Sequence, residues 1–126
     1  MNIESPMTEA IHPLGEYLHF LRRIARLLKG CGSKVIFATT TPILESGEAI
    51  DEQTRARIKY SNEWVKTYNS AAKLLMAEEK IEINDLYELC LEDKLYYKCP
   101  DMLHLTEEGY KRCAEQVCEH IIKYLD

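Results

Sequence analysis

The stretch Lys34-Val-Ile-Phe-Ala-Thr-Thr40 decides the fold of this chain. It is a short, almost continuous run of β-branched and aromatic residues, which is typical of a parallel strand covered on both faces. A second short strand is predicted at Lys80-Ile-Glu-Ile-Asn84, which ends at Asp85. Since helical stretches separate and flank these two strands, the sequence indicates an α/β fold with a short parallel sheet.

Three helices are predicted around the two strands. The first begins at Pro13 and ends at Gly30 and Gly32, and the second runs from about Asp51, or from Ser61 at the latest, to Glu79. The third is capped by Thr106, because a threonine side chain can accept a hydrogen bond from the first helical turn. The expected inward stripes are Leu14, Leu18, Leu21, Ala25 and Leu28; then Trp64, Val65, Tyr68, Ala71, Ala72, Leu75 and Met76; then Tyr110, Cys113, Ala114, Val117, Ile121 and Leu125. Residues 41–54 show no sustained period and are expected to form a long loop after the first strand.

Length and composition limit the class of protein. A chain of 126 residues is sized for one domain, residues 1–126, and 46% hydrophobic with 29% charged residues is ordinary globular usage. A net charge of −5 disfavours nucleic acid as a partner. We expect no membrane contact, because no apolar run reaches the roughly 18 to 20 residues that span a bilayer. The five cysteines include no CxxC pair, and the first ten residues do not resemble a secretory signal, so we expect reduced thiols and a cytoplasmic location.

The most informative local pattern is Asp101-Met-Leu-His104-Leu-Thr-Glu-Glu-Gly-Tyr110, which directly precedes the last helix. An aspartate and a histidine three positions apart on a turn can place the carboxylate against one imidazole nitrogen and leave the other as a general base. Taken alone, the spacing is more often a surface turn in which the histidine only binds backbone at a helix start. The wider sequence favours the first interpretation.

The chain resembles the C-terminal part of the SGNH (GDSL-type) hydrolases over nearly its whole length. Lys34-Val-Ile-Phe-Ala-Thr-Thr-Thr-Pro42 resembles the family's fourth strand, Ile83-Asn-Asp-Leu-Tyr87 its fifth, and Asp101 to Tyr110 its D-x-x-H-L-T-x-x-G block. Tyr17-Leu18 resembles part of the helix before the fourth strand, and Asn69 part of the helix after it. The resemblance implies a partial flavodoxin-like three-layer fold. It also implies that Asp101 orients His104, and that His104 is the base for a serine that attacks an ester.

The nucleophile and oxyanion blocks of that family have no counterpart in this chain, which contains neither GDS nor GxND. Ser33 enters a strand at its amino end, whereas sites in such folds gather at the carboxyl ends. Ser46 lies in the long loop and is better explained as a turn residue. We therefore expect a truncated ester hydrolase segment that keeps Asp101 and His104, lacks its own serine, and is weak or inactive alone.

The missing strands predict association. One edge of the Lys34 to Thr39 strand and the apolar faces of the flanking helices would lack cover, and open edges promote pairing. We expect a homo-oligomer through this edge, or a polypeptide that supplies the missing N-terminal half. The alternative function is a non-catalytic interaction module that reuses half of the hydrolase fold.

Other candidate sites have simpler explanations, and we expect neither a metal nor a cofactor. Cys99, Asp101, His104, Cys113, Cys118 and His120 are close in sequence. A shared zinc ion is disfavoured because Cys113 and Cys118 lie roughly 140° apart around a helix. Asp85 follows a strand, where ligands can bind, but an aspartate there is more often a helix cap. The basic and histidine side chains of the first helix region are interpreted as surface groups: His12, His19, Arg22, Arg23 and Arg26. Three tyrosines could either line a cleft or cover the core, and the sequence does not decide between these roles: Tyr87, Tyr96 and Tyr97.

Overall fold

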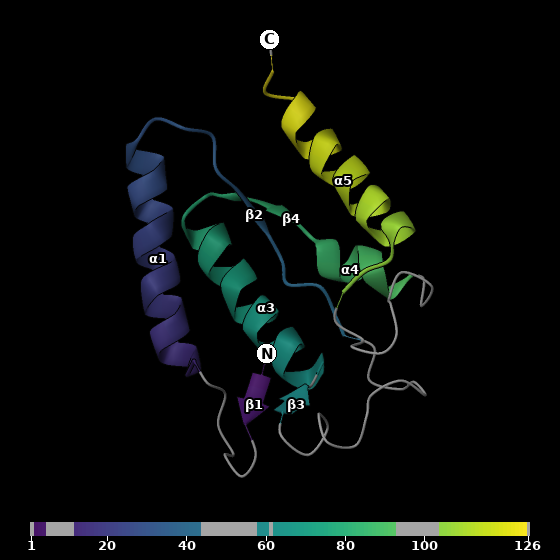
Figure 1. Cartoon of the computed structure of the whole chain (residues 1–126). Helices are drawn as coiled ribbons and strands as arrows, with labels where there is room; N and C mark the ends of the chain where they lie inside the picture. The colour runs from purple at the N-terminus through teal and green to yellow at the C-terminus, as the bar shows by residue number, and fades with distance from the viewer. Residues whose placement is uncertain (1, 5–11, 44–57, 61, 93–103, 126) are drawn as a thin grey trace.

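The computed structural model describes residues 2–4, 12–43, 58–60, 62–92 and 104–125 (Figure 1). Its centre is a pair of parallel strands, β2 (Ile36–Ala38) and β4 (Glu82–Asn84), in which Phe37 lies opposite Ile83. The helix α3 (Asn62–Glu78) connects them. The architecture is therefore α/β, as the sequence predicts, although the first strand is shorter than residues 34–40.

The helix α1 (Leu14–Gly30) precedes β2 and packs against α3 (Figure 1). It begins directly after Pro13 and ends before Gly32, whose positive φ of 78° reverses the chain at low steric cost. Leu18, Leu21 and Ala25 pack with Leu75 and Met76 of α3, together with Val35, Phe37, Ile81 and Ile83. This cluster is the core on one face of the sheet.

Ion pairs join the same two helices at the surface. Arg22 binds Glu78 and Glu79, each at 2.8 Å, and Arg26 binds Glu79 at 3.0 Å. Burial opposes ionisation of Glu79, but the two arginines lower its pKa below the ordinary value. Two members of the predicted basic face are thus partners of α3, whereas Arg23 is exposed on the helix surface.

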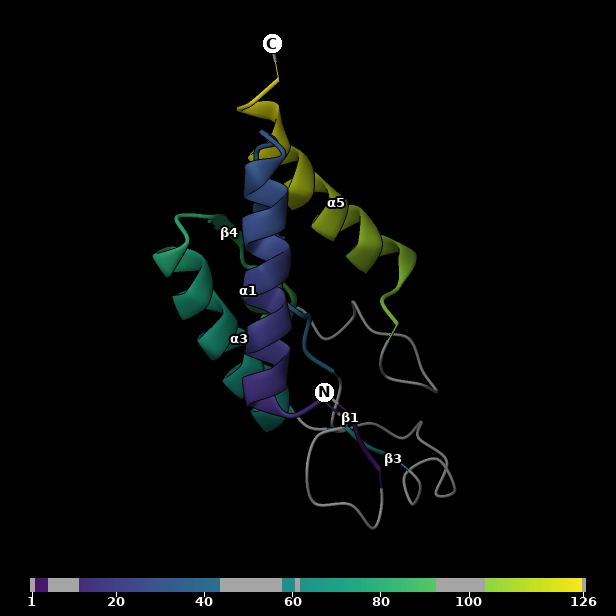
Figure 2. The same cartoon turned by 90° about the vertical axis from the view of Figure 1, so that its left-hand side faces the viewer.

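The strand β4 shows that helices cover both faces of the sheet. Ile81 and Ile83 pack toward α1 and α3, whereas Glu82 and Asn84 bind residues of α5 (Glu107–Ile122). Because successive side chains of a strand point to opposite faces, α5 lies across the sheet from α3 (Figure 2). This arrangement is part of a three-layer, flavodoxin-like fold.

A cluster of hydrogen bonds holds the end of α5 to β4. The Glu82 carboxylate accepts from Tyr124 and Lys123, and its Oε2 lies 2.7 Å from Nδ1 of His120. Tyr124, His120 and Lys123 lower the pKa of Glu82 to about 2 against the opposing effect of burial. The carboxylate therefore ties His120 of the last turn of α5, and the two residues Lys123 and Tyr124 that follow the helix, to one strand.

The short helix α4 (Leu86–Leu91) follows β4 and meets the start of α5. Leu89, Cys90, Leu105 and Cys113 form a second apolar cluster between these helices. The two thiol sulfurs of Cys90 and Cys113 are 3.6 Å apart.

Three features differ from the expectation. The helix α3 begins at Asn62, close to the later of the two predicted starts, and a start near Asp51 is wrong because residues 58–60 form a strand. A second, antiparallel pair joins β1 (Asn2–Glu4) to β3 (Ile58–Tyr60), which no periodic pattern indicated. Part of the predicted inward stripes is also exposed: Leu28, Tyr110, Ala114, Ile121 and Leu125 face solvent. Among the described residues, no helix is long and apolar enough to cross a bilayer.

Candidate functional site

The carboxyl ends of the two parallel strands meet through Thr39 and Asp85. Thr39 is buried; its hydroxyl donates to Oδ1 of Asp85 at 2.9 Å and accepts from the backbone N–H of Tyr87 at 2.9 Å. The other carboxylate oxygen of Asp85 accepts from Nζ of Lys73 at 3.1 Å. One short network therefore links the exits of β2 and β4 to α3 and to the start of α4.

Asp85 serves as the cap of α4. Its Oδ1 accepts from the backbone N–H of Glu88 at 3.3 Å, as the helix-cap interpretation predicts. Burial opposes ionisation of Asp85, but Lys73, Thr39 and the Glu88 N–H together lower its pKa. Both carboxylate oxygens are engaged within the chain, which supports a structural role over a ligand-binding one.

Two asparagines of α3 shape the segment that leaves β2. The buried Asn69 accepts from the N–H of Thr40 at 3.0 Å and donates to its carbonyl at 2.8 Å. Asn62 binds the N–H and carbonyl of Ile43 in the same way, at 2.8 and 2.7 Å. In the sequence, this arrangement is indicated only by an asparagine on the apolar face of the predicted helix. That position does not reveal that Asn69 binds the backbone of Thr40.

His104 lies at the start of α5, next to two anchored residues. Leu105 is buried against Leu89 and Cys90, and the Thr106 hydroxyl accepts from the Gly109 N–H at 3.1 Å. This N-cap confirms the predicted start of the last helix. Because Leu105 packs against α4, the helix that follows β4, the backbone at His104 lies next to α4, and His104 itself is exposed.

Asp101 lies outside the described residues, as do Cys99, Tyr96, Tyr97 and Ser46. The pairing of Asp101 with His104 therefore stays a prediction. Of the described serines, Ser33 precedes β2 at its amino end, as expected, and Ser70 lies on the exposed surface of α3.

The described members of the suggested zinc set lie apart. Cys113 is buried beside Cys90, Cys118 is exposed, and His120 binds Glu82. Within the described residues, no three histidine, cysteine or acidic side chains form a group that could hold a metal ion. Tyr87 is buried, so it covers the core and does not line an open cleft.

Solved hydrolases share this arrangement of elements. The chain is similar to a GDSL-like lipase from Bacteroides thetaiotaomicron VPI-5482, with 20% identity and a TM-score of 0.73 over 92% of this chain and 56% of that chain. It is also similar to a lipase/acylhydrolase from Enterococcus faecalis, with 19% identity and a TM-score of 0.64 over 86% of this chain and 53% of that one. No family model and no curated protein sequence matches the chain.

The chain has the fold of a partial SGNH hydrolase. A third similar structure, the esterase domain of the ORF1 protein from the zebrafish ZfL2-1 retrotransposon, matches 87% of this chain and 60% of its own length, with 13% identity and a TM-score of 0.66. The chain thus spans little more than half the length of the solved hydrolases that it matches.

Proposed function

We propose that this chain provides the general-base portion of an SGNH-type ester hydrolase. The observation that carries the proposal is the setting of His104: it is exposed, and it is followed by Leu105, which packs against the helix α4 after β4, and by the capping Thr106. The hydrolase-like fold supports the reaction class, and the D-x-x-H spacing supports Asp101 as the residue that orients the imidazole.

The chemistry requires a serine from a further polypeptide segment. That hydroxyl attacks the ester carbonyl while His104 accepts its proton, and the imidazolium then returns the proton to the departing alcohol. Water, deprotonated by the same imidazole, releases the acid and regenerates the serine. The resemblance favours acyl or acetyl esters of carbohydrates or lipids as substrates, and the reduced cysteines favour the cytoplasm as the place of the reaction.

An isolated chain should hydrolyse such esters poorly. Members of a nucleophile–base pair act as a unit, so the loss of one removes most of the acceleration. A serine-directed phosphonate probe should label no serine of the isolated chain. Labelling of any serine would contradict the proposal that the nucleophile comes from elsewhere.

The test of the base is hydrolysis of an acetylated sugar by this chain mixed with a polypeptide that carries the first half of an SGNH hydrolase. His104→Ala should lower kcat by about 100-fold or more, because general-base catalysis contributes about that factor. His19→Ala is the matched control, since His19 is an exposed histidine of α1. Activity that survives His104→Ala unchanged would refute the role of His104.

A second candidate function is a non-catalytic interaction module. Several large apolar side chains of α1 and α5 are exposed, and they favour this function. Single apolar side chains on a surface are common, whereas contiguous apolar patches mark sites of contact with another protein. Absence of ester hydrolysis in the completed assembly, with His104 intact, would favour this candidate over the hydrolase.

A further inference from the structure

Two thiol groups lie in contact inside the cluster that joins α4 to α5. The sulfurs of Cys90 and Cys113 are 3.6 Å apart, and both side chains are buried with Leu89 and Leu105. Because a disulfide bond is about 2.05 Å long, each sulfur needs to move by less than about 1 Å for a bond to form. Displacements of that size are ordinary thermal motion in a folded protein. The two thiols are therefore placed for a covalent link between the two helices.

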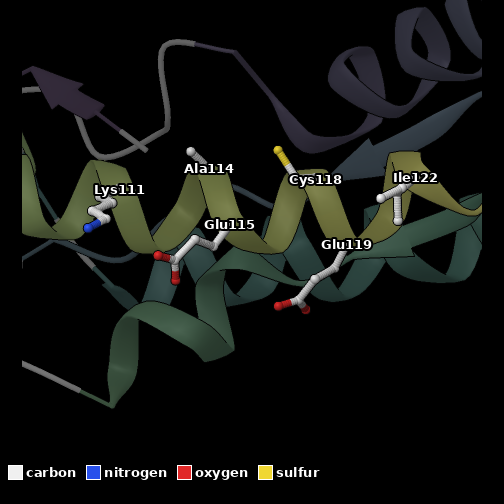
Figure 3. Close-up of a pocket in the computed structure, with 6 residues that line it drawn as sticks. All are labelled: Lys111, Ala114, Glu115, Cys118, Glu119 and Ile122. Atoms are coloured by element: carbon white, nitrogen blue, oxygen red, sulfur yellow. The ribbon is translucent and has the colours of Figure 1, made fainter.

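The other described cysteines are not placed for such a link. Cys31 is exposed directly after the helix α1. Cys118 is exposed on α5, roughly 140° around the helix from Cys113. It lines an open groove on the surface of α5 together with Ala114 (Figure 3). Within the part of the chain that the structure describes, burial and direct contact thus distinguish Cys90 and Cys113 from the remaining thiols.

A small molecule can reach this pair when α4 opens locally. The helix has only six residues, and a helix of that length depends on its packing for stability, so it opens more readily than a long helix. Its last residue, Leu91, directly follows Cys90 and is 53% exposed. Cys113 keeps 8% of its surface exposed, against 2% for Cys90. A small oxidant such as hydrogen peroxide therefore meets the sulfur of Cys113 first.

The chemistry of the link has two steps. The Cys113 thiolate attacks one oxygen of hydrogen peroxide; the O–O bond breaks, a sulfenic acid forms, and the other oxygen leaves as water after taking up a proton. The Cys90 thiolate then attacks the sulfenic sulfur, the S–O bond breaks, and a second water leaves as the S–S bond forms. In sum, two thiols lose two electrons and two protons, and one peroxide becomes two water molecules. A dithiol such as dithiothreitol reverses the link by thiol–disulfide exchange and is itself oxidised.

We propose that Cys90 and Cys113 are a redox modification site, at which hydrogen peroxide forms a reversible disulfide between α4 and α5. The two cysteines are 23 positions apart, so the bond closes a loop of the chain that contains His104. A closed loop has fewer conformations in the unfolded chain, and the folded state is stabilised in comparison. Transient disulfides in reducing compartments commonly act as redox sensors. The proposed site does not depend on whether His104 takes part in hydrolysis.

The test is peptide mapping of the oxidised chain by mass spectrometry. The Cys118→Ala variant is used, so that the tryptic peptide of residues 113–123 contains one cysteine. The reduced variant is treated with hydrogen peroxide, unfolded in urea with iodoacetamide, and digested with trypsin. We expect this peptide to be joined to the peptide of residues 81–94, which contains Cys90, with a mass two hydrogen atoms below their sum. A dithiothreitol step before alkylation should separate the two peptides.

Thermal melting gives an independent readout. Peroxide should raise the Tm of the parent chain by about 5 °C or more, and dithiothreitol should reverse the rise. Cys90→Ala and Cys113→Ala should each abolish the rise while circular dichroism shows that the helices persist, whereas Cys31→Ala, the matched control, should keep it.

Three results would overturn the proposal. The first is alkylation of both Cys90 and Cys113 after the peroxide treatment. The second is a link from either of them to Cys99, which lies outside the described residues. The third is a rise in Tm that survives in Cys90→Ala, because the stabilisation would then have another cause.

Discussion

The Asn69 side chain holds both backbone groups of Thr40, accepting from its N–H at 3.0 Å and donating to its carbonyl at 2.8 Å. Asn69 is 4% exposed and lies in the middle of α3, whereas Thr40 is the second residue after β2. One side chain thus determines how the chain leaves the central strand β2.

Asn69→Ala should therefore destabilise the fold. The change removes the hydrogen-bond partner of two backbone groups, the N–H and the carbonyl of Thr40. A loss of about 2 kcal/mol in the free energy of unfolding is expected. Urea denaturation followed by circular dichroism measures it. Ser70→Ala, on the exposed neighbour, should stay within about 0.5 kcal/mol of the parent. Equal stability of the Asn69→Ala variant and the parent would show that the contact with Thr40 is dispensable.

Stability should depend on pH through Glu82. The pKa of this carboxyl falls from 4.5 to about 2 in the folded chain, so below pH 4.5 the unfolded chain binds more protons than the folded one. Its contribution is fully present above pH 4.5 and is lost as the pH falls toward 2. Thermal melts between these values should show a falling Tm in the parent chain.

Glu82→Gln should flatten this pH dependence, because the amide does not titrate. Glu88→Gln, an exposed change on α4, provides the comparison and should leave the slope as it is. If Glu82→Gln melts with the same pH slope as the parent, the contacts with Tyr124, His120 and Lys123 are not responsible for the acid sensitivity.

Removal of the α5 cap should weaken the segment that carries His104. Thr106→Ala deletes the hydroxyl that accepts from Gly109, and an N-cap of this kind contributes about 1 kcal/mol. Thr106→Ser keeps the acceptor and should restore most of the loss. The free energy of unfolding by urea distinguishes these variants; a serine variant as unstable as the alanine variant would point to the lost methyl group and not to the cap.

A polar group in place of the Cys113 thiol should destabilise the fold, because it would lie in the apolar cluster between α4 and α5. Cys113→Ser places a hydroxyl among Leu89, Cys90 and Leu105, and about 1 to 2 kcal/mol of destabilisation is expected for a poorly paired buried hydroxyl. Cys118→Ser, on the exposed side of the same helix, should be nearly neutral. The two variants can be compared by chemical denaturation, and a neutral Cys113→Ser would argue against a dry cluster.

The sequence predicts correctly those features that depend on residues within a single helix or strand. The apolar run ending at Thr40 predicted a parallel strand, Gly30 marked a helix end, and Asp85 and Thr106 were recognised as caps, because strand burial and capping depend on neighbours within a few residues. The pair of β1 with β3 was missed, since each strand has only three residues and its partner is more than fifty positions away.

The amino-acid sequence by itself determined the α/β class, the bounds of α1, the start of α5, the hydrolase resemblance and the choice of His104 as a candidate base. Only the tertiary structure decided which side of each helix has a partner: Arg22 turns to α3 and Gln116 turns to β4, whereas Ile24 of α1 and Ile121 of α5 stay exposed. The physical reason is that the periodicity of a sequence shows only which residues share an apolar face of a helix. The neighbours that cover them are set by how the layers stack.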